Sequence, residues 1–120
     1  MKIYISGPIT GIEGYMKKFE EMEKILTSFG YTVVNPARVN AELPEDTTHE
    51  EYMTTSIAML NMCDAIFMME GWSDSKGCSI EFDHACKRGM PIVFEKGEKA
   101  EPLSSKMNVR YRTISRQRDS

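Results

Sequence analysis

The stretch DAIFMMEGWSDSKGCSIEFDHACKRGMPIVFE, residues 64–95, contains two apolar runs separated by a polar loop and a helix-like segment. The first run, residues 64–70, is almost continuously apolar, which is typical of a strand buried on both faces. Residues 79–88 predict a helix that ends at Gly89, and residues 91–95 predict the next strand. A strand, a helix and a strand in this order predict a right-handed crossover in a parallel sheet.

The same alternation extends toward the N-terminus. Residues 2–6, KIYIS, predict a first strand, and apolar residues then recur at helical spacing from residue 14 to a C-terminal cap at Gly30. Residues 31–36, YTVVNP, predict a second strand, followed by a loop-like segment up to Thr48, the expected N-cap of a further helix. We therefore predict an α/β fold with a parallel sheet covered on both faces.

Composition indicates one globular domain. The chain has 120 residues, of which 41% are hydrophobic and 28% charged, which argues against wholesale disorder. No apolar run approaches the ~20 residues of a membrane helix, and the N-terminus lacks the apolar region of a signal peptide. A net charge of -3 argues against a nucleic-acid polymer as partner. We expect a cytoplasmic protein without a membrane partner.

Basic residues crowd the C-terminal segment. Beyond Pro102 the only acidic residue is Asp119, whereas the same segment carries Lys106, Arg110, Arg112, Arg116 and Arg118. We interpret residues 1–102 as the domain and residues 103–120 as a basic segment that forms a frayed tail or, over residues 103–114, an edge strand. A subunit contact or a phosphate-attracting arm is the alternative.

The cysteines and histidines do not predict a metal site. Cys63, Cys78 and Cys86 are an odd number without the short paired spacing of zinc ligands, so reduced and mostly buried thiols are expected. Glu81 and His84 can share a helix face, but further ligands are missing. The sequence therefore predicts no metal and no cofactor.

Three loops rich in glycine, proline and small polar residues follow the predicted strands: GPITG at residues 7–11, NPA at 35–37 and GWSDSKG at 71–77. Ligands of open parallel sheets bind at the carboxyl ends of the strands, so a site is expected where these loops meet. None of the three is a Walker A or G-x-G-x-x-G sequence, and an ordinary turn is the alternative for each. Ser73, Ser75 and the amides near Gly77 precede a helix, whose N-terminus attracts anions such as phosphate.

Glu81 is predicted in the first turn of that helix. Many glutamates at this position only stabilise the helix dipole. Because Glu81 follows a strand end and a glycine loop, its carboxylate can instead face the ligand crevice and attack an anomeric carbon, as in retaining glycosyl transfer. Trp72 can stack on a base or a sugar, and packing in the core is the alternative.

Five motifs occur in a characteristic order: IYISGPITG, VVNP, CDAI, GWSDSKG and the E-x-x-x-A of Glu81 to Ala85. Together they resemble the nucleoside 2-deoxyribosyltransferase superfamily over residues 2–94, including its 2'-deoxynucleoside 5'-monophosphate N-glycosidases and a bacterial and phage branch. The resemblance implies a flavodoxin- or Rossmann-like three-layer sandwich with a four- to five-stranded parallel sheet. It also implies a homo-oligomer that cleaves or exchanges the N-glycosidic bond of a small-molecule nucleoside or nucleotide without metal.

The resemblance assigns roles to individual residues. It implies that Glu81 is the nucleophile, that Tyr4 lies beneath the sugar and positions Glu81, and that Ser75 and Gly77 hold a 5'-phosphate. The remaining predicted substrate-binding residues are Ser6, Gly7, Pro8, Ile9, Thr10, Gly11, Asn35, Pro36, Gly71, Trp72, Ser73 and Asp74.

Ser56 departs from the family pattern. Counting back from Asp64, which we interpret as structural, relatives usually carry an aspartate here that assists catalysis at the sugar and the leaving base. A serine cannot act as a carboxylic acid near neutral pH, and proton donation typically contributes ~10² to 10⁴ in rate. Either another group, such as Asp74 or a carboxylate of a neighbouring subunit, replaces it at this catalytic position, or activity is weakened.

Three functions remain open. The first is an N-glycosidase or 2-deoxyribosyltransferase that acts through Glu81, and the second is a nucleotide-binding module without turnover. The third is a glycohydrolase of nicotinamide dinucleotide, for which the same oxocarbenium chemistry applies but which no residue specifically favours.

Overall fold

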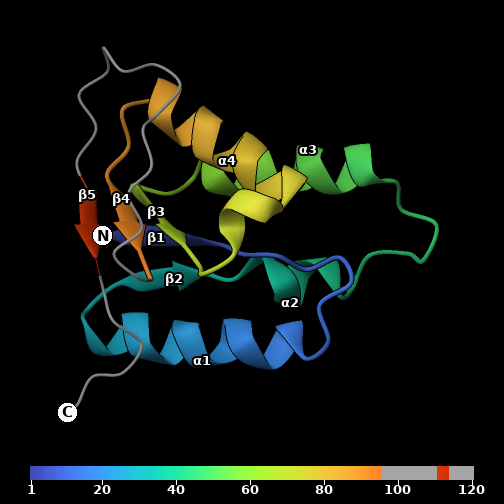
Figure 1. Ribbon diagram of the computed structural model, residues 1–120, viewed down its shortest axis with the longest axis horizontal. Coiled ribbons are helices and arrows are strands. Elements are labelled where there is room, and N and C mark those ends of the chain that lie inside the picture. Colours follow the sequence, from blue (N-terminus) through green and yellow to red (C-terminus); the bar gives the residue numbers. More distant parts are fainter. Residues whose placement is uncertain (96–110, 114–120) are drawn as a thin grey trace.

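Five parallel strands form one sheet in the order β2-β1-β3-β4-β5 (Figure 1). The computed structural model describes residues 1–95 and 111–113. This strand order is that of flavodoxin-like folds, and the order reverses between β1 and β3, where ligands of such sheets bind. The predicted α/β fold with a parallel sheet is confirmed. The strands are β1 (Lys2–Ser6), β2 (Thr32–Val34), β3 (Ala65–Met68), β4 (Ile92–Phe94) and β5 (Tyr111–Thr113).

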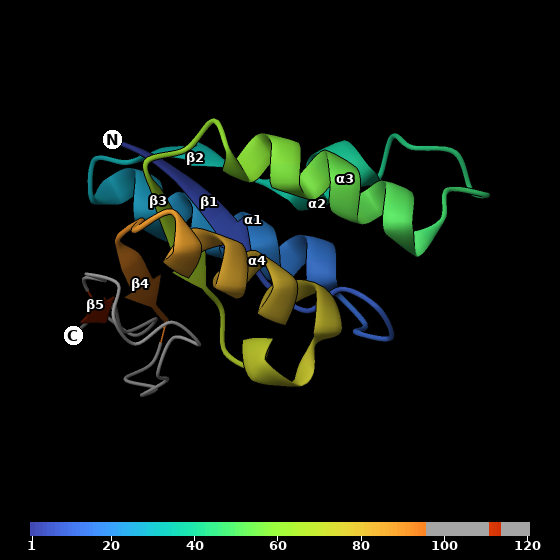
Figure 2. The same ribbon diagram turned by 90° about the horizontal axis from the view of Figure 1, so that it is seen from above.

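Helices cover both faces of the sheet and make it the middle of three layers (Figures 1 and 2). α1 (Tyr15–Ser28) packs against one face, and α3 (His49–Leu60) and α4 (Lys76–Lys87) pack side by side against the other. Side chains alternate along a strand, so the buried Ile3 and Ile5 of β1 face α1, whereas Tyr4 and Ser6 point toward α3 and α4.

The central strand and the following helices form as their local sequence predicts. All four residues of β3 are buried, as expected for an apolar strand between two neighbours and under helices on both faces. α3 begins at a capping box, in which Thr48 Oγ1 accepts from the Glu51 N–H at 3.1 Å and Glu51 Oε1 accepts from the Thr48 N–H at 2.9 Å.

Two boundaries differ from the prediction. The segment after β2, predicted to be a loop, contains the short helix α2 (Pro36–Asn40), because Asn35 caps it and a proline suits the first helical position. α4 begins at Lys76 and not at residue 79, because Ser75 caps it by accepting from the Cys78 N–H at 3.2 Å. Glu81 therefore lies in the second turn of α4, so the prediction that it lies in the first turn is wrong.

Of the predicted C-terminal basic segment, residues 103–120, the structure describes only residues 111–113. β5 lies at the edge of the sheet beside β4, within the range predicted for an edge strand. The remaining residues of the predicted basic segment, 103–110 and 114–120, lie outside the described residues. Among the described residues, no helix has both the length and the apolar character that crossing a membrane requires.

Candidate active site

The carboxylate of Glu81 lies against the face of β1 that is turned toward α3 and α4. Tyr4 Oη donates to Glu81 Oε2 at 2.6 Å, and Ser6 Oγ donates to Glu81 Oε1 at 2.5 Å. Only 6% of Glu81 is exposed. Each carboxylate oxygen thus has its own hydroxyl donor from one strand, which fixes the orientation of the side chain.

Burial controls the protonation of this cluster. It raises the pKa of the Glu81 carboxyl, and hydrogen bonds from Ser6, Tyr4 and Ser56 act in the opposite direction. Burial, together with the nearby charge of Glu81, also raises the pKa of the Tyr4 phenol well above its ordinary value, so that Tyr4 stays a donor. A buried carboxyl with a perturbed pKa that borders a cavity is a candidate functional group.

A cavity of about 300 Å³, here called the inner cavity, borders Glu81. Its volume is at the lower end of the range of small-molecule sites, which suits a ligand of nucleoside size. The lining residues are Gly7, Ile9, Thr10, Tyr15, Asn40, His49, Tyr52, Met53, Ser56, Ser75, Gly77, Cys78 and Glu81.

A second cavity of about 890 Å³, the outer cavity, adjoins the first. The two share the lining residues Ile9, Thr10, His49, Ser75 and Gly77. The outer cavity is also lined by Pro8, Ile12, Lys18, Met69, Glu70, Gly71, Asp74 and Lys76. Its lining contains the acidic residues Glu70 and Asp74, the basic residues Lys18 and Lys76, and the N-terminal turn of α4.

Most of the predicted site residues come together at this place. The first loop supplies Gly7, Ile9 and Thr10 to the inner cavity and Pro8 to the outer one. The segment before α4 supplies Ser75 to both cavities and Gly71 and Asp74 to the outer one, and Gly77, in the first turn of α4, borders both. The two loops meet because β1 and β3 are parallel neighbours, so their carboxyl ends lie at the same edge.

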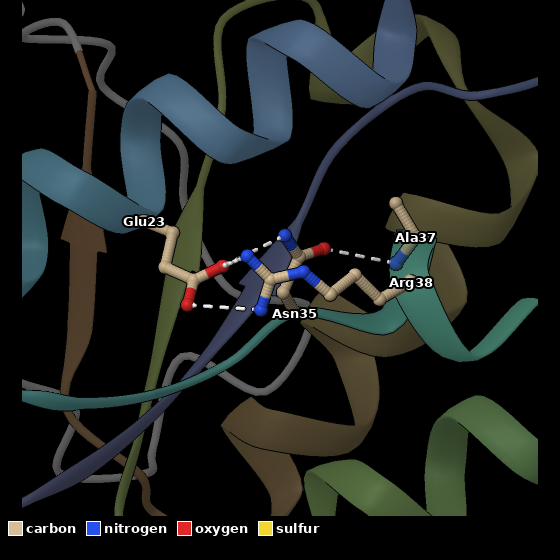
Figure 3. A network of polar contacts seen from close by, with 4 residues as sticks. All are labelled: Glu23, Asn35, Ala37 and Arg38. Atoms are coloured by element: carbon tan, nitrogen blue, oxygen red, sulfur yellow. Dashed lines mark hydrogen bonds and ion pairs between the residues drawn. The ribbon is translucent and has the colours of Figure 1, made fainter.

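Asn35 and Pro36, predicted to bind substrate, border neither cavity. Asn35 Oδ1 accepts from the Ala37 N–H at 3.0 Å, and its Nδ2 donates to Glu23 Oε1 at 3.1 Å (Figure 3). Arg38 joins the same carboxylate through Nη2 at 2.9 Å and Nη1 at 3.2 Å. Asn35 thus caps α2 and ties it to α1, and Pro36 is the buried first residue of α2, so both have structural roles here.

Trp72, Ser73 and Gly11 also line neither cavity. Trp72 is 6% exposed and packs on Phe82, with ring centroids 4.6 Å apart, and on Phe94. Its environment is the core and not a substrate surface, because α4 and β4 enclose the ring. Ser73 and Gly11 are exposed. We leave these three residues out of the candidate site.

Several lining residues on helices were not predicted from the sequence. His49, Tyr52 and Met53 line the inner cavity together with Ser56, and Tyr15 does so from the start of α1. On a helix, positions i, i+3, i+4 and i+7 share one face. The predicted helix starting after Thr48, combined with the importance given to Ser56, was therefore a sufficient signal for finding His49.

Other reactive groups are less suited to chemistry. Cys63, Cys78 and Cys86 are free and buried, and burial raises the pKa of each thiol to about 11, which disfavours the nucleophilic thiolate. Within the described part of the chain, no three His, Cys, Asp or Glu side chains are grouped as a metal would require. Asp64 accepts from the Lys2 N–H at 2.8 Å, at the amino ends of the strands and away from Glu81.

Most of the fold and both cavities lie within the part of the chain that one known protein family covers. A family described as "Domain of unknown function (DUF4406)" matches residues 1–94. The chain belongs to this family. The matched residues of this DUF4406 chain include all the helices of the described residues, the first four strands and every residue that borders the two cavities. No curated protein matches the chain.

A solved structure shares the fold of this DUF4406 chain. It is a 2-deoxyribosyltransferase from the psychrotolerant bacterium Bacillus psychrosaccharolyticus, with a TM-score of 0.66 and 21% sequence identity. The likeness covers 91% of this chain and 82% of that one. The predicted fold is thus the fold of a 2-deoxyribosyltransferase, although so low an identity establishes the fold alone.

Proposed function

We propose that this protein cleaves or transfers at the N-glycosidic bond of a (deoxy)nucleoside or its 5'-monophosphate, with Glu81 as nucleophile. The observation that carries the proposal is the buried Glu81 carboxylate, which borders a cavity of about 300 Å³ and is held by Tyr4 and Ser6. The shared fold with a 2-deoxyribosyltransferase supports the same class of reaction. So does the resemblance of the ordered motifs to that superfamily.

The reaction takes two steps. In the first, one oxygen of Glu81 bonds to the anomeric carbon while the carbon–nitrogen bond breaks, and the electron pair leaves with the base nitrogen, which takes up a proton. In the second, water or an acceptor base attacks the anomeric carbon and the bond to Glu81 breaks. Tyr4 and Ser6 hold the carboxylate in line, and its negative charge stabilises the oxocarbenium character of the transition state.

A 5'-phosphate is best accommodated beside the start of α4. Ser75 and Gly77 border both cavities, and Lys76 and Lys18 border the outer one. Backbone N–H groups and the helix dipole attract anions at such a terminus. A monophosphate bound there extends its sugar toward Glu81, which lies in the next turn of the same helix.

The second candidate is a nucleotide-binding module without turnover. Ser56 motivates it, because this buried serine hydrogen-bonds Glu81 and Tyr4 at the position where a carboxylic acid is usual in the family it resembles. A hydroxyl there helps to hold Glu81 but does not supply a proton at neutral pH.

Base release distinguishes these candidates. The purified protein is incubated with a panel of ribonucleosides, deoxynucleosides and their 5'-monophosphates, with and without an acceptor base, and free base is measured by chromatography. We expect release by the wild type and none by Glu81→Gln, whereas Glu20→Gln, an exposed change on α1, leaves release unchanged.

Two results would reject the enzyme. They are release from no member of the panel, and undiminished release by Glu81→Gln. Calorimetric titration with the same panel then tests the binding module, for which nucleotide binding survives Glu81→Gln and no product forms on long incubation.

A further inference from the structure

His49 lines the inner cavity from the same face of α3 as Ser56. The two residues stand at positions i and i+7, with Tyr52 and Met53 between them on that face, and all four border the cavity that contains Glu81. At the rise of an α-helix, His49 lies about 10 Å along the axis from Ser56. This separation places the imidazole toward the mouth of the inner cavity, where that cavity adjoins the outer one.

We propose that His49 is the general acid that protonates the leaving base, in the role that Ser56 cannot fill. The inference rests on the proposed function, because it names the proton donor of the same reaction. With the sugar against Glu81, a base directed along the α3 face lies between Ser56 and His49.

The other groups that border the inner cavity are poorer donors. Glu81 is occupied as nucleophile, and the Cys78 thiol is buried, with a pKa raised to about 11. The inner cavity is also bordered by Tyr15 and Tyr52, but an unperturbed phenol is in general a much weaker acid than an imidazolium. Asp74, the alternative considered from the sequence, borders only the outer cavity. Histidine is the side chain whose proton exchange falls in the physiological pH range.

Charges of both signs surround the imidazole. Glu81 shares the inner cavity with it, and Lys18, Glu70, Asp74 and Lys76 share the outer one. On its own helix, Glu50 and Glu51 attract a positive charge, whereas the α3 N-terminus repels it.

The two proton transfers balance the reaction. As the glycosidic bond breaks, the imidazolium gives its proton to a nitrogen of the base and becomes a neutral imidazole. In hydrolysis, water then attacks the anomeric carbon, its proton passes to the imidazole, and the bond to Glu81 breaks. The sum is nucleoside plus water giving free base plus sugar, with His49 and Glu81 regenerated.

The dependence on the leaving group tests this role. Wild type and His49→Gln are compared on the nucleoside or nucleotide substrate found with the panel, and on a 4-nitrophenyl glycoside of the same sugar, whose phenolate leaves without a proton. We expect base release by His49→Gln to fall by ~10² to 10⁴, while nitrophenolate release falls far less. The fall in kcat/KM of the wild type at alkaline pH should also disappear in the variant.

Several outcomes would overturn the inference. Equal losses with both leaving groups would show a positioning or folding role, and an unchanged wild-type-like pH profile would exclude His49 as the titrating acid. A rise in KM confined to 5'-monophosphates, with kcat kept, would make His49 a phosphate ligand. His49→Asn, a second uncharged polar replacement, repeats the test if His49→Gln does not fold.

The failure of this inference is distinct from that of the proposed function. If the wild type releases no base from any substrate, the proposed function itself fails, before any His49 variant is measured. If the wild type and both His49 variants release base equally well, Glu81 chemistry stands and only the assignment of the acid is wrong.

Discussion

The phenol of Tyr4 donates a 2.6 Å hydrogen bond to Oε2 of Glu81 and joins β1 to α4 across 77 positions of the sequence. Ser6, two residues further along the strand, holds the other oxygen at 2.5 Å. Alternate residues of a strand point to the same face, so β1 presents two hydroxyls to one carboxylate while Ile3 and Ile5 fill the core on the opposite face.

Removing the Tyr4 hydroxyl should move the pH profile. In Tyr4→Phe, one of the hydrogen bonds that lower the pKa of Glu81 is lost, so this pKa rises further. As the proposed nucleophile, Glu81 must be ionised, so activity is expected to be lost as the pH falls through its pKa. We therefore expect the acid limb of kcat/KM to move to higher pH and the rate near neutrality to fall about 10- to 100-fold. Tyr31→Phe serves as control, because Tyr31 packs against the core on the other face of the sheet. A shift of the acid limb of Tyr4→Phe to lower pH would contradict the prediction.

Replacing the buried carboxyl should stabilise the fold at neutral pH. The pKa of folded Glu81 is raised above its ordinary value of 4.5, mainly by burial. The folded state thus holds the proton more tightly than the unfolded state, and wild-type stability falls as the pH rises through this window. Glu81→Gln lacks this loss, so we expect a higher Tm than wild type at pH 8 and a smaller difference at pH 4. Thermal denaturation at both pH values checks it, and a gain in Tm over wild type that is smaller at pH 8 than at pH 4 would refute it.

Gly7 is required by close packing at the start of the first loop. A Cβ at this position would overlap the Met69 sulphur and lie 3.1 Å from Phe19 Cζ. We expect Gly7→Ala to lower the free energy of unfolding by about 1–3 kcal/mol, because the core must shift. Thermal denaturation checks this. The double variant Gly7→Ala/Met69→Ala should lose less free energy of unfolding than the two single variants lose in sum. Strict additivity of the two losses would argue against the overlap.

Ser75 offers a test of the 5'-phosphate. Ser75→Asp keeps a good N-cap for α4 but places a negative charge where both cavities meet. We expect turnover of a 5'-monophosphate to fall roughly ten-fold, an effect of about 1.4 kcal/mol, while turnover of the nucleoside changes little.

The matched control for this change is Ser73→Asp. It adds the same charge at an exposed position outside both cavities. Equal losses with both substrates in Ser75→Asp, or the same loss in Ser73→Asp, would count against a phosphate beside Ser75.

Much of this architecture could be predicted because burial and capping leave local signatures. The apolar run of β3 and the capping box at Thr48 need no knowledge of distant residues. The boundaries that were missed involve ambiguous local signals. Asn35-Pro36 suits either a turn or a helix start, and either Ser75 or Ser79 is a suitable cap, so only the folded backbone distinguishes the alternatives.

The sequence by itself determined the α/β class and the parallel sheet, because strand and helix periods and the right-handed crossover follow from local chemistry. It predicted three loops at one site, of which two border the cavities. Only the tertiary structure decided that Ser6 joins Tyr4 in holding Glu81 and that Trp72 is enclosed by Phe82 and Phe94. Those contacts depend on how helices far apart in the chain pack on the sheet, and the local periodicity of each segment carries no information about that packing.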